Sequence, residues 1–177
     1  MSTYKLNNTT LVLLRGNIVD VQVDAIVNAA NSGLAGGSGV DGAIHRAGGP
    51  TIMQECRKIG GCPTGSAVAT TAGRLKAQYV FHAVGPVYHQ RGDDARLLAS
   101  AYQACLDLAE QYAVKSIAFP SISTGVYGYP VEEAAPIALR TVSEHIKKAT
   151  SLQQVIFVLF SNDVYSVYEK ALGDLLP

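Results

Sequence analysis

The chain has 177 residues, of which 48% are hydrophobic and 16% are charged, and its formal net charge is zero. This composition excludes a disordered segment, and a chain of this length can bury about 70% of its unfolded surface, so we expect one globular domain spanning residues 1–177. The lack of a basic excess argues against a protein that holds nucleic acid by neutralising its phosphates, and the longest apolar run, at 155–160, is far too short to cross a bilayer.

Strand and helix patterns alternate along the chain. In order, the sequence predicts strands over 11–14 and 25–27, helices over 40–47 and 51–58, strands over 67–71 and 79–84, a helix over 95–112, a strand over 116–119, a helix over 130–146, a strand over 155–160 and a final helix toward residue 176. Pro130 suits the first turn of its helix, where its missing N–H would be unbonded anyway, and Asn162 can cap the last helix. This alternation predicts a sheet sandwiched between helical layers, in a single α/β/α domain.

A glycine-rich loop follows the strand at 25–27 and leads into a helix. It has four glycines between positions 33 and 39, and two polar residues, Asn31 and Asp41, flank it. Glycine allows backbone N–H groups to approach a ligand closely, and the helix N-terminus adds partial positive charge. The stretch therefore predicts a site for a phosphorylated ligand, with catalytic or orienting side chains built in.

A second loop with glycines, at 121–129, follows the strand at 116–119. Ligands of open α/β sheets bind at the carboxyl ends of strands, so the two loops face each other across one cleft if their strands are neighbours. Ser123, Thr124 and Gly125 offer hydroxyls and close backbone N–H groups. Two such loops suit a diphosphate better than a single phosphate.

Each candidate side chain also fits an ordinary structural role. Asp41 also fits a structural N-cap or first-turn aspartate, and Asn31 fits a turn residue that bonds its own backbone. Tyr127, between two glycines, can lie against a ligand ring, whereas Phe160, at the end of the last strand, can stack on a base or simply pack. His45 shares a helix face with Asp41, and we expect it to be packed or solvated rather than functional.

Several other kinds of site are excluded by missing motifs. The chain has no G-x-x-x-x-G-K-[ST], so a P-loop enzyme is not indicated, and Gly36-Gly-Ser-Gly39 is not the elbow of a serine hydrolase. It also lacks H-E-x-x-H and C-x-x-C, and only Arg15-Gly16-Asn17 stands where a dinucleotide-binding enzyme would carry its glycine fingerprint. We therefore expect neither a metal nor a cofactor.

The cysteines indicate a reducing compartment. Cys56, Cys62 and Cys105 have no metal-site spacing, and we expect reduced, structural thiols there. His82 lies within a predicted strand and is expected in the core. The first residues lack the apolar core of a signal peptide, so we expect a cytoplasmic protein.

At the level of whole motifs, the sequence resembles macrodomains of the MacroD type. The motifs, in order, are Val23-Asp-Ala-Ile-Val-Asn-Ala-Ala-Asn31, Gly36-Gly-Ser-Gly-Val-Asp-Gly-Ala-Ile-His45, Pro63-Thr-Gly65, His82-Ala-Val-Gly-Pro86 and Ser121-Ile-Ser-Thr-Gly-Val-Tyr-Gly-Tyr-Pro130. The likeness runs from about residue 11 to residue 172 and rests on several long motifs in the right order.

The resemblance implies a three-layer α/β/α fold with a central mixed, mostly parallel sheet. It also implies an ADP-ribosyl ester hydrolase, which removes mono-ADP-ribose from acidic side chains and deacetylates O-acetyl-ADP-ribose without a metal. The implied partners are ADP-ribose, O-acetyl-ADP-ribose and mono-ADP-ribosylated proteins. We expect a monomer with no membrane partner and no nucleic-acid partner.

The resemblance assigns roles to the two polar residues that flank the first loop. Asn31 would hold the distal ribose, and Asp41 would orient or activate the attacking water, either as general base or with help from a substrate phosphate. Leaving as a carboxylate is chemically easy, so modest acid–base help suffices. The ligand-binding residues implied are Asn17, Ile18, Asn31, Gly37, Ser38, Gly39, Val40, Asp41, Ser123, Thr124, Gly125, Val126, Tyr127 and Phe160.

Two positions depart from the family pattern. The usual Gly-Asp-Ile is here Gly16-Asn17-Ile18, and an uncharged amide acceptor predicts weaker adenine binding or a relaxed base preference. Ser38 replaces the third of four glycines. If the backbone there needs a positive φ, serine adds strain of about 1 kcal/mol, or its hydroxyl bonds a phosphate instead.

Two other functions stay open. A non-catalytic ADP-ribose-binding module would keep affinity without turnover, although the presence of both Asn31 and Asp41 favours the enzyme. An RNA-associated regulator would need a local basic patch, for which Arg91 and Arg96 are the candidates.

Overall fold

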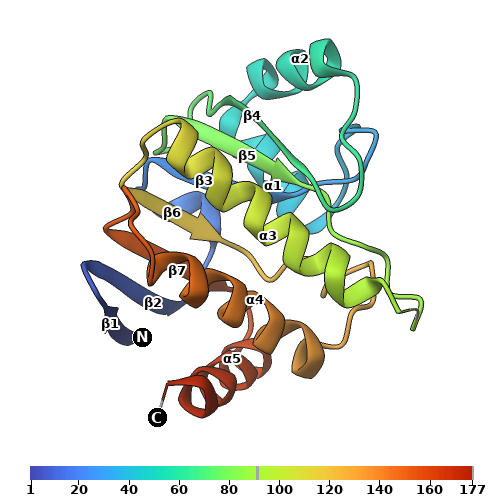
Figure 1. Ribbon diagram of the computed structural model, residues 1–177. Helices are drawn as coiled ribbons and strands as arrows, with labels where there is room; N and C mark the ends of the chain where they lie inside the picture. The colour runs from blue at the N-terminus through green and yellow to red at the C-terminus, as the bar shows by residue number, and fades with distance from the viewer. Residues whose placement is uncertain (91, 177) are drawn as a thin grey trace.

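A mixed sheet of seven strands forms the centre of the computed structural model, which describes residues 1–90 and 92–176 (Figure 1). The strands are β1 (Ser2–Leu6), β2 (Thr9–Arg15), β3 (Ala25–Ala29), β4 (Ala67–Thr71), β5 (Tyr79–Ala83), β6 (Ser116–Phe119) and β7 (Gln154–Leu159). Their order across the sheet is β1-β2-β7-β6-β3-β5-β4. The pairs β1–β2 and β4–β5 are antiparallel and the remaining neighbours are parallel, so the expected mixed, mostly parallel sheet is confirmed.

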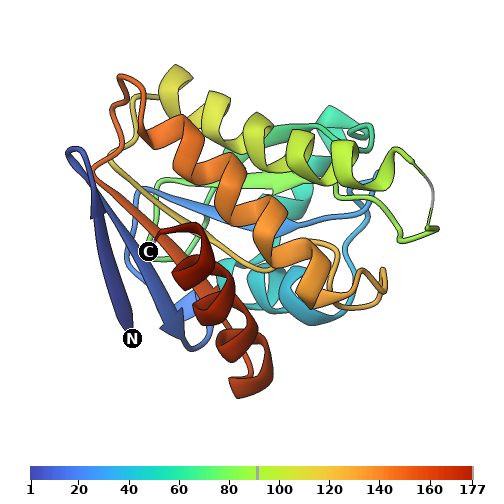
Figure 2. The ribbon, with the colours of Figure 1, turned by 60° about the horizontal axis from the view of Figure 1, so that its bottom comes forward.

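Helices cover both faces of this sheet. The helices are α1 (Gly39–Gly48), α2 (Pro50–Ile59), α3 (Asp94–Gln111), α4 (Val131–Ile146) and α5 (Asn162–Leu175), with a short 3₁₀ turn, η1, at Ile18–Asp20. Figures 1 and 2 show α3, α4 and α5 side by side on one face, while α1 and α2 lie on the other. The three-layer α/β/α architecture is therefore confirmed. In the described parts of the chain, no helix combines the length and apolar character needed to span a bilayer.

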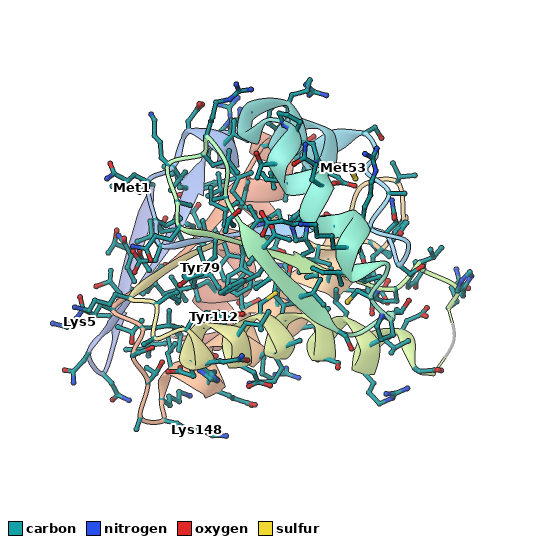
Figure 3. All side chains as sticks on the ribbon, turned by 90° about the horizontal axis from the view of Figure 1, so that it is seen from above. Met1, Lys5, Met53, Tyr79, Tyr112 and Lys148 are labelled. Carbon is teal, nitrogen blue, oxygen red and sulfur yellow. The ribbon has the colours of Figure 1, made fainter. Side chains whose placement is uncertain are left out.

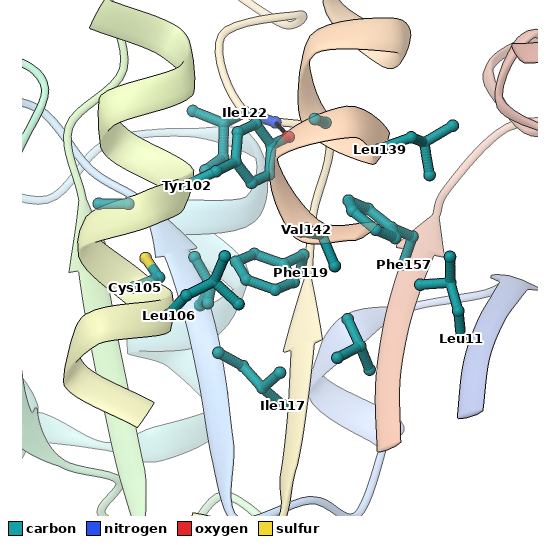
Figure 4. Packing of buried hydrophobic residues seen from close by; sticks show 14 of the residues in the cluster. Leu11, Tyr102, Cys105, Leu106, Ile117, Phe119, Ile122, Leu139, Val142 and Phe157 are labelled. Atoms are coloured by element: carbon teal, nitrogen blue, oxygen red, sulfur yellow. Dashed lines mark hydrogen bonds between the residues drawn. The ribbon is translucent and has the colours of Figure 1, made fainter. Parts of the chain in front are cut away.

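Each face of the sheet has its own hydrophobic core, because successive side chains of a strand point to opposite faces. Beneath α3, α4 and α5, Tyr102 packs against Phe119 and Phe157, with ring centroids 5.4 and 6.2 Å apart (Figure 4). Beneath α1 and α2, strand residues such as Ile26 and Val80 meet helix residues from both, and all are fully buried. The parallel strands read as continuous apolar runs because both faces are covered.

An aromatic cluster closes the first core near the end of α3. Tyr79 of β5 and Tyr112, the residue that ends α3, lie side by side in Figure 3, with ring centroids 4.8 Å apart. Phe81 lies 6.1 Å from each of them. This stacking fixes the C-terminal end of α3, the longest helix, against β5, the strand that pairs with β3.

Sequence and structure differ at the chain's two ends. The strand β1 was not predicted, and it pairs with β2 to form an antiparallel edge. Its residues alternate between half-buried and exposed, so the short segment carries no apolar run. The cap predicted at Asn162 is wrong by one residue, because Ser161 is the cap and its side chain accepts from the Val164 N–H at 3.2 Å.

The central strands β3 and β6 are parallel neighbours, with Ala25 opposite Ile117 and Ile26 opposite Ala118. The loops that follow these two strands therefore leave the same edge of the sheet side by side. This confirms the condition under which the two glycine loops were expected to share one cleft.

Candidate functional site

A cavity of about 280 Å³ lies at the carboxyl ends of β3, β5 and β6. Its lining consists of residues that follow these strands or begin α1, namely Ala29, Ala30, Asn31, Gly37, Ser38, Gly39, Val40, Asp41, Gly85, Ser121, Ile122, Ser123, Gly125, Val126 and Tyr127. Ligand-binding cavities of proteins commonly enclose roughly 300–1,000 Å³, so this one is near the lower end of that range. The structure thus brings both predicted loops to one site.

Asn31 both lines the cavity and braces the first loop. Its Oδ1 accepts from the Ala35 N–H at 3.0 Å, and its Nδ2 donates to the Gly36 carbonyl at 2.9 Å. Gly36 has a φ of 80°, which side chains rarely adopt, so glycine is needed at this turn. The role of Asn31 as a turn residue is therefore confirmed, and one amide hydrogen and one carbonyl lone pair remain for a ligand.

The first loop ends in the N-terminus of α1. Ser38 is the N-cap with φ −96° and ψ −173°, while Gly39 has a φ of 60°. The condition for strain at Ser38, a positive φ, is not met, since its backbone is extended and the positive φ falls on Gly39. Its side chain makes no capping bond. Hydrogen bonding of this hydroxyl to a phosphate stays a prediction.

Asp41 occupies the first turn of α1 and is 6% exposed. Its Oδ1 accepts from the Asn28 amide at 2.9 Å and lies 3.2 Å from His45 Nε2. Its Oδ2 lies 3.4 Å from the place where a Cβ on Gly37 would stand, and Gly37 also lines the cavity. One oxygen is thus held by protein groups while the other faces the glycine loop.

Two core tyrosines hold the start of the second loop. The Tyr102 hydroxyl accepts from the Ile122 N–H at 2.9 Å, the dashed line in Figure 4, and donates to the Pro120 carbonyl at 3.3 Å. The Tyr168 hydroxyl donates to Ser121 Oγ at 2.9 Å. These bonds tie the loop to α3 and α5, so the cavity wall is set from inside the core.

Ser123 has an unusual backbone conformation at the bottom of this loop. Its φ is 67°, it is 6% exposed, and its Oγ has no hydrogen-bond partner among the described residues. A Cβ on Gly85, which follows β5, would meet Ser123 Oγ at 2.2 Å and Ile122 Cγ2 at 2.5 Å. Glycine at position 85 therefore permits the close approach of the Ser123 side chain to β5, beside the cavity that both residues line.

The rim of the second loop is more exposed than its base. Val126 is 89% exposed, and the Tyr127 carbonyl accepts from the Tyr88 N–H at 2.9 Å. Thr124 does not line the cavity, because its hydroxyl donates toward Ser121 Oγ and the Ser121 carbonyl at 2.8 and 3.1 Å. A ligand contact from Thr124 stays a prediction.

Three further candidates, Asn17, Ile18 and Phe160, lie outside the cavity lining. They follow β2 and β7, which pair with each other and continue the same sheet edge beyond β6. Asn17 caps η1 by accepting from the Val19 N–H at 3.2 Å, Ile18 is 4% exposed, and Phe160 is 80% exposed. An extended ligand could reach Phe160 along this edge, and the adenine roles of these residues stay predictions.

Sequence reasoning missed five residues of the lining: Ala29, Ala30, Gly85, Ser121 and Ile122. All five lie within the motifs that carry the resemblance, but their side chains offer no polar group that would mark Ala29, Ala30 or Gly85 as ligand contacts. The sequence also suggested no function for Asn28, which contacts Asp41 in the structure.

The remaining predictions concern histidines, cysteines and charge. His82 is 1% exposed and all three cysteines are buried, as expected, and the cysteines are free thiols. Arg91 lies outside the described residues, and Arg96 lies 3.8 Å from Asp93 in an exposed ion pair. Among the residues that the structure describes, no group of three or more His, Cys, Asp or Glu side chains could hold a metal ion.

Comparison with known proteins gives a consistent match. The model of the Macro domain family matches residues 27–138. A macro domain-containing protein of Caldanaerobacter subterraneus is 60% identical over 168 residues, covering 92% of this chain and 95% of that protein. A protein of Pantoea vagans named O-acetyl-ADP-ribose deacetylase 1 is 48% identical over 168 residues, covering 92% and 98% of the two chains.

Solved structures agree with this match. A macrodomain of Oceanobacillus iheyensis with ADP superposes with a TM-score of 0.95 at 40% identity, covering 99% of this chain and 96% of that one. A macrodomain of Trypanosoma brucei in complex with ADP-ribose gives a TM-score of 0.88 at 43% identity, covering 92% of this chain and 69% of that one.

Proposed function

Because this chain belongs to the Macro domain family, we propose that it binds ADP-ribose and hydrolyses ADP-ribosyl esters. Its reactions would be the removal of mono-ADP-ribose from acidic side chains of proteins and the deacetylation of O-acetyl-ADP-ribose. The names of a Pantoea vagans relative and the ligands of two solved relatives support this substrate class. We also propose that residues 1–177 form one macrodomain, since the likeness to the Oceanobacillus iheyensis structure covers 99% of the chain.

One observation carries the enzymatic part of the proposal. The buried Asp41 carboxylate stands at the wall of a cavity built from two glycine loops, with Oδ1 held by Asn28 and near His45. Backbone N–H groups at such loops and at a helix N-terminus suit a diphosphate. A carboxylate next to that diphosphate is in the right place to act on water beside the distal ribose.

In the proposed reaction, Asp41 orients a water molecule toward the anomeric carbon of the distal ribose. The water oxygen forms the new bond to that carbon while the bond to the ester oxygen breaks, and the acidic side chain leaves as a carboxylate. The proton of the water passes to Asp41 or to a substrate phosphate. Asn31 would hold the distal ribose through its remaining amide hydrogen, while Gly39 and Val40 would meet the diphosphate.

The test is release of ADP-ribose from a glutamate-ADP-ribosylated protein, measured for wild type, Asp41→Ala and Asn31→Ala, with ADP-ribose affinity measured by calorimetry. We expect Asp41→Ala to lower kcat at least about 100-fold while affinity changes little, because a positioned acid–base group contributes about that much. Asp107→Ala, an exposed carboxylate on α3, is the matched control and should leave kcat unchanged.

Two other results would change the conclusion. Binding of ADP-ribose by wild type without any turnover would make the protein a reader of ADP-ribosylation rather than a hydrolase. Absence of both binding and turnover would overturn the proposed function altogether.

A further inference from the structure

A row of buried polar side chains lies directly behind Asp41, away from the cavity. Asn28 of β3 is 0% exposed, His82 of β5 is 1% exposed and Thr70 of β4 is 4% exposed. Asn28 and His82 stand opposite each other in the parallel register of β3 and β5. They belong to the face of the sheet that α1 and α2 cover, so the row connects the edge strand β4 to the first turn of α1.

The distances in this row fit one direction of donation. Thr70 Oγ1 lies 2.9 Å from both the Thr71 carbonyl and His82 Nε2, and with its single proton on the carbonyl it accepts from His82 Nε2, near which Cys56 Sγ also lies at 3.8 Å. His82 Nε2 therefore carries a proton. Burial, with a smaller contribution from His45, lowers the pKa of His82 to about 4, so the ring is neutral near pH 7 and its Nδ1 is a bare acceptor.

The side-chain nitrogen of Asn28 contacts both Asp41 and His82. Its Nδ2 lies 2.9 Å from Asp41 Oδ1 and 3.1 Å from His82 Nδ1, so each amide hydrogen has its own acceptor. Its Oδ1 is buried without a partner among the described residues. Rotating the amide by 180° would place this carbonyl against the Asp41 carboxylate and against the His82 lone pair, which both neighbours disfavour.

We propose that His82 is a positioning residue for the reaction at Asp41. Its Nδ1 lone pair fixes the orientation of the Asn28 amide, and that amide holds Asp41 Oδ1 so that Oδ2 faces the cavity. This inference rests on the proposed function, because it assigns a consequence to the placement of Asp41. His82 itself is not among the residues that line the cavity.

Two substitutions of His82 test the roles of its two ring nitrogens separately. In His82→Asn the side-chain carbonyl takes the place of Nδ1 and keeps an acceptor for Asn28, while the donor to Thr70 is lost. In His82→Gln the longer amide takes the place of Nε2 and keeps the bond to Thr70, while the acceptor for Asn28 is lost. Both variants lose the ring, so we expect similar losses in thermal stability.

The proposal predicts that their catalytic effects differ. His82→Gln should lower kcat at least about tenfold, because a small displacement of a catalytic group can cost up to about 100-fold. His82→Asn should stay within about threefold of wild type in kcat. The affinity for ADP-ribose should change less than about twofold in both, since the loops that would bind the diphosphate are untouched.

A double-mutant cycle tests whether the effect passes through Asn28. In the Asn28→Ala background, His82→Gln should cause no further loss of kcat, because no amide is left to orient. Equal losses of kcat in the two His82 variants, or an unchanged effect of His82→Gln without Asn28, would overturn the positioning role and leave His82 a packing residue.

The tautomer of His82 can be measured without any assay of activity. The ring ¹⁵N shifts of His82 in the free protein report its tautomer, and we expect a proton on Nε2 and none on Nδ1 at neutral pH. A proton on Nδ1 would overturn the hydrogen-bond assignment even in an active enzyme. If the tautomer is as expected and wild type has no turnover, the proposed function fails and the catalytic consequence of His82 fails with it.

Discussion

At the scale of single residues, Ser123 has two features that lower the stability of the free protein. A non-glycine residue with a φ of 67° is strained by about 1 kcal/mol, and its buried hydroxyl lacks a partner among the described residues. Such features gather at functional sites, where a ligand supplies what the free protein lacks. Ser123 also lines the cavity, so we propose that its hydroxyl bonds the diphosphate when the ligand is bound.

We therefore expect Ser123→Ala to be more stable than wild type by about 1 kcal/mol, because an unsatisfied buried hydroxyl costs about 1–3 kcal/mol. The same variant should bind ADP-ribose at least about threefold more weakly. Denaturant unfolding and calorimetry check the two effects. Ser123→Gly, which also removes the backbone strain, should bind no more weakly than Ser123→Ala, and wild-type affinity in Ser123→Ala would show that the hydroxyl is not used.

The residues that sequence reasoning could find are those whose type and place are both unusual. Asp41 and Asn31 flank a glycine loop, so their positions along the chain alone point to a functional role. The link between Asn28 and His82 is not, since the two lie 54 positions apart and meet only because β3 pairs with β5 in a particular register. A polar residue within an apolar strand signals a buried partner but not its identity.

At the scale of elements, the second loop depends on a helix that contributes nothing to the cavity lining. Tyr102 of α3 is fully buried, and its hydroxyl serves both the Ile122 N–H and the Pro120 carbonyl. The loop would lose both bonds if that hydroxyl were removed, while the ring would keep its contacts with Phe119 and Phe157.

Tyr102→Phe should therefore lower the free energy of unfolding by about 1–3 kcal/mol, as expected for backbone groups left buried without partners. It should also weaken ADP-ribose binding and speed hydrogen exchange at the Ile122 amide. Tyr168→Phe, which removes the bond to the Ser121 side chain but no bond to the loop backbone at Ile122, is the control and should affect that amide less. Equal exchange rates in the two variants would contradict the anchoring role.

The helices and strands that sequence predicted best are those with a complete apolar pattern. The helix predicted at 95–112 is found at Asp94–Gln111, and the strand predicted at 116–119 is found with the same bounds. The hairpin strand β1 was missed because an exposed edge needs no apolar run, although the two asparagines at positions 7 and 8 are typical of a tight turn, and Asn7 has a φ of 54°.

At the scale of the whole molecule, one carboxylate links several elements at the end of the sheet away from the cavity. Glu110, near the end of α3, accepts from His145 Nε2 of α4 at 2.7 Å, from the Ser151 N–H at 2.9 Å and from the Ser151 hydroxyl at 3.0 Å. The Thr150 hydroxyl also donates to it. These contacts join two helices of one layer to the segment that leads into β7.

The charge of Glu110 should make the stability of the fold depend on pH. Partial burial raises its pKa, but the hydrogen bonds from the Ser151 N–H, Thr150 and His145 outweigh burial and lower the pKa from 4.5 to about 2. The folded pKa lies below the unfolded one, so the stabilisation is complete above about pH 5 and is lost as the pH falls toward 2.

Because its side chain is 32% exposed, solvent screening reduces the contribution of Glu110 to about 1–2 kcal/mol. Glu110→Gln should be less stable than wild type by this amount at pH 7, and the difference should shrink as the pH is lowered from 5 to 2. Urea unfolding at several pH values measures this difference, with Glu144→Gln, an exposed carboxylate on α4, as the control. The contacts of Glu110 with His145 and Ser151 lie before the start of β7, whereas the cavity lies at the carboxyl ends of the strands, so kcat at pH 7 should be unchanged. A difference that persists at pH 2 would assign its effect to packing rather than charge.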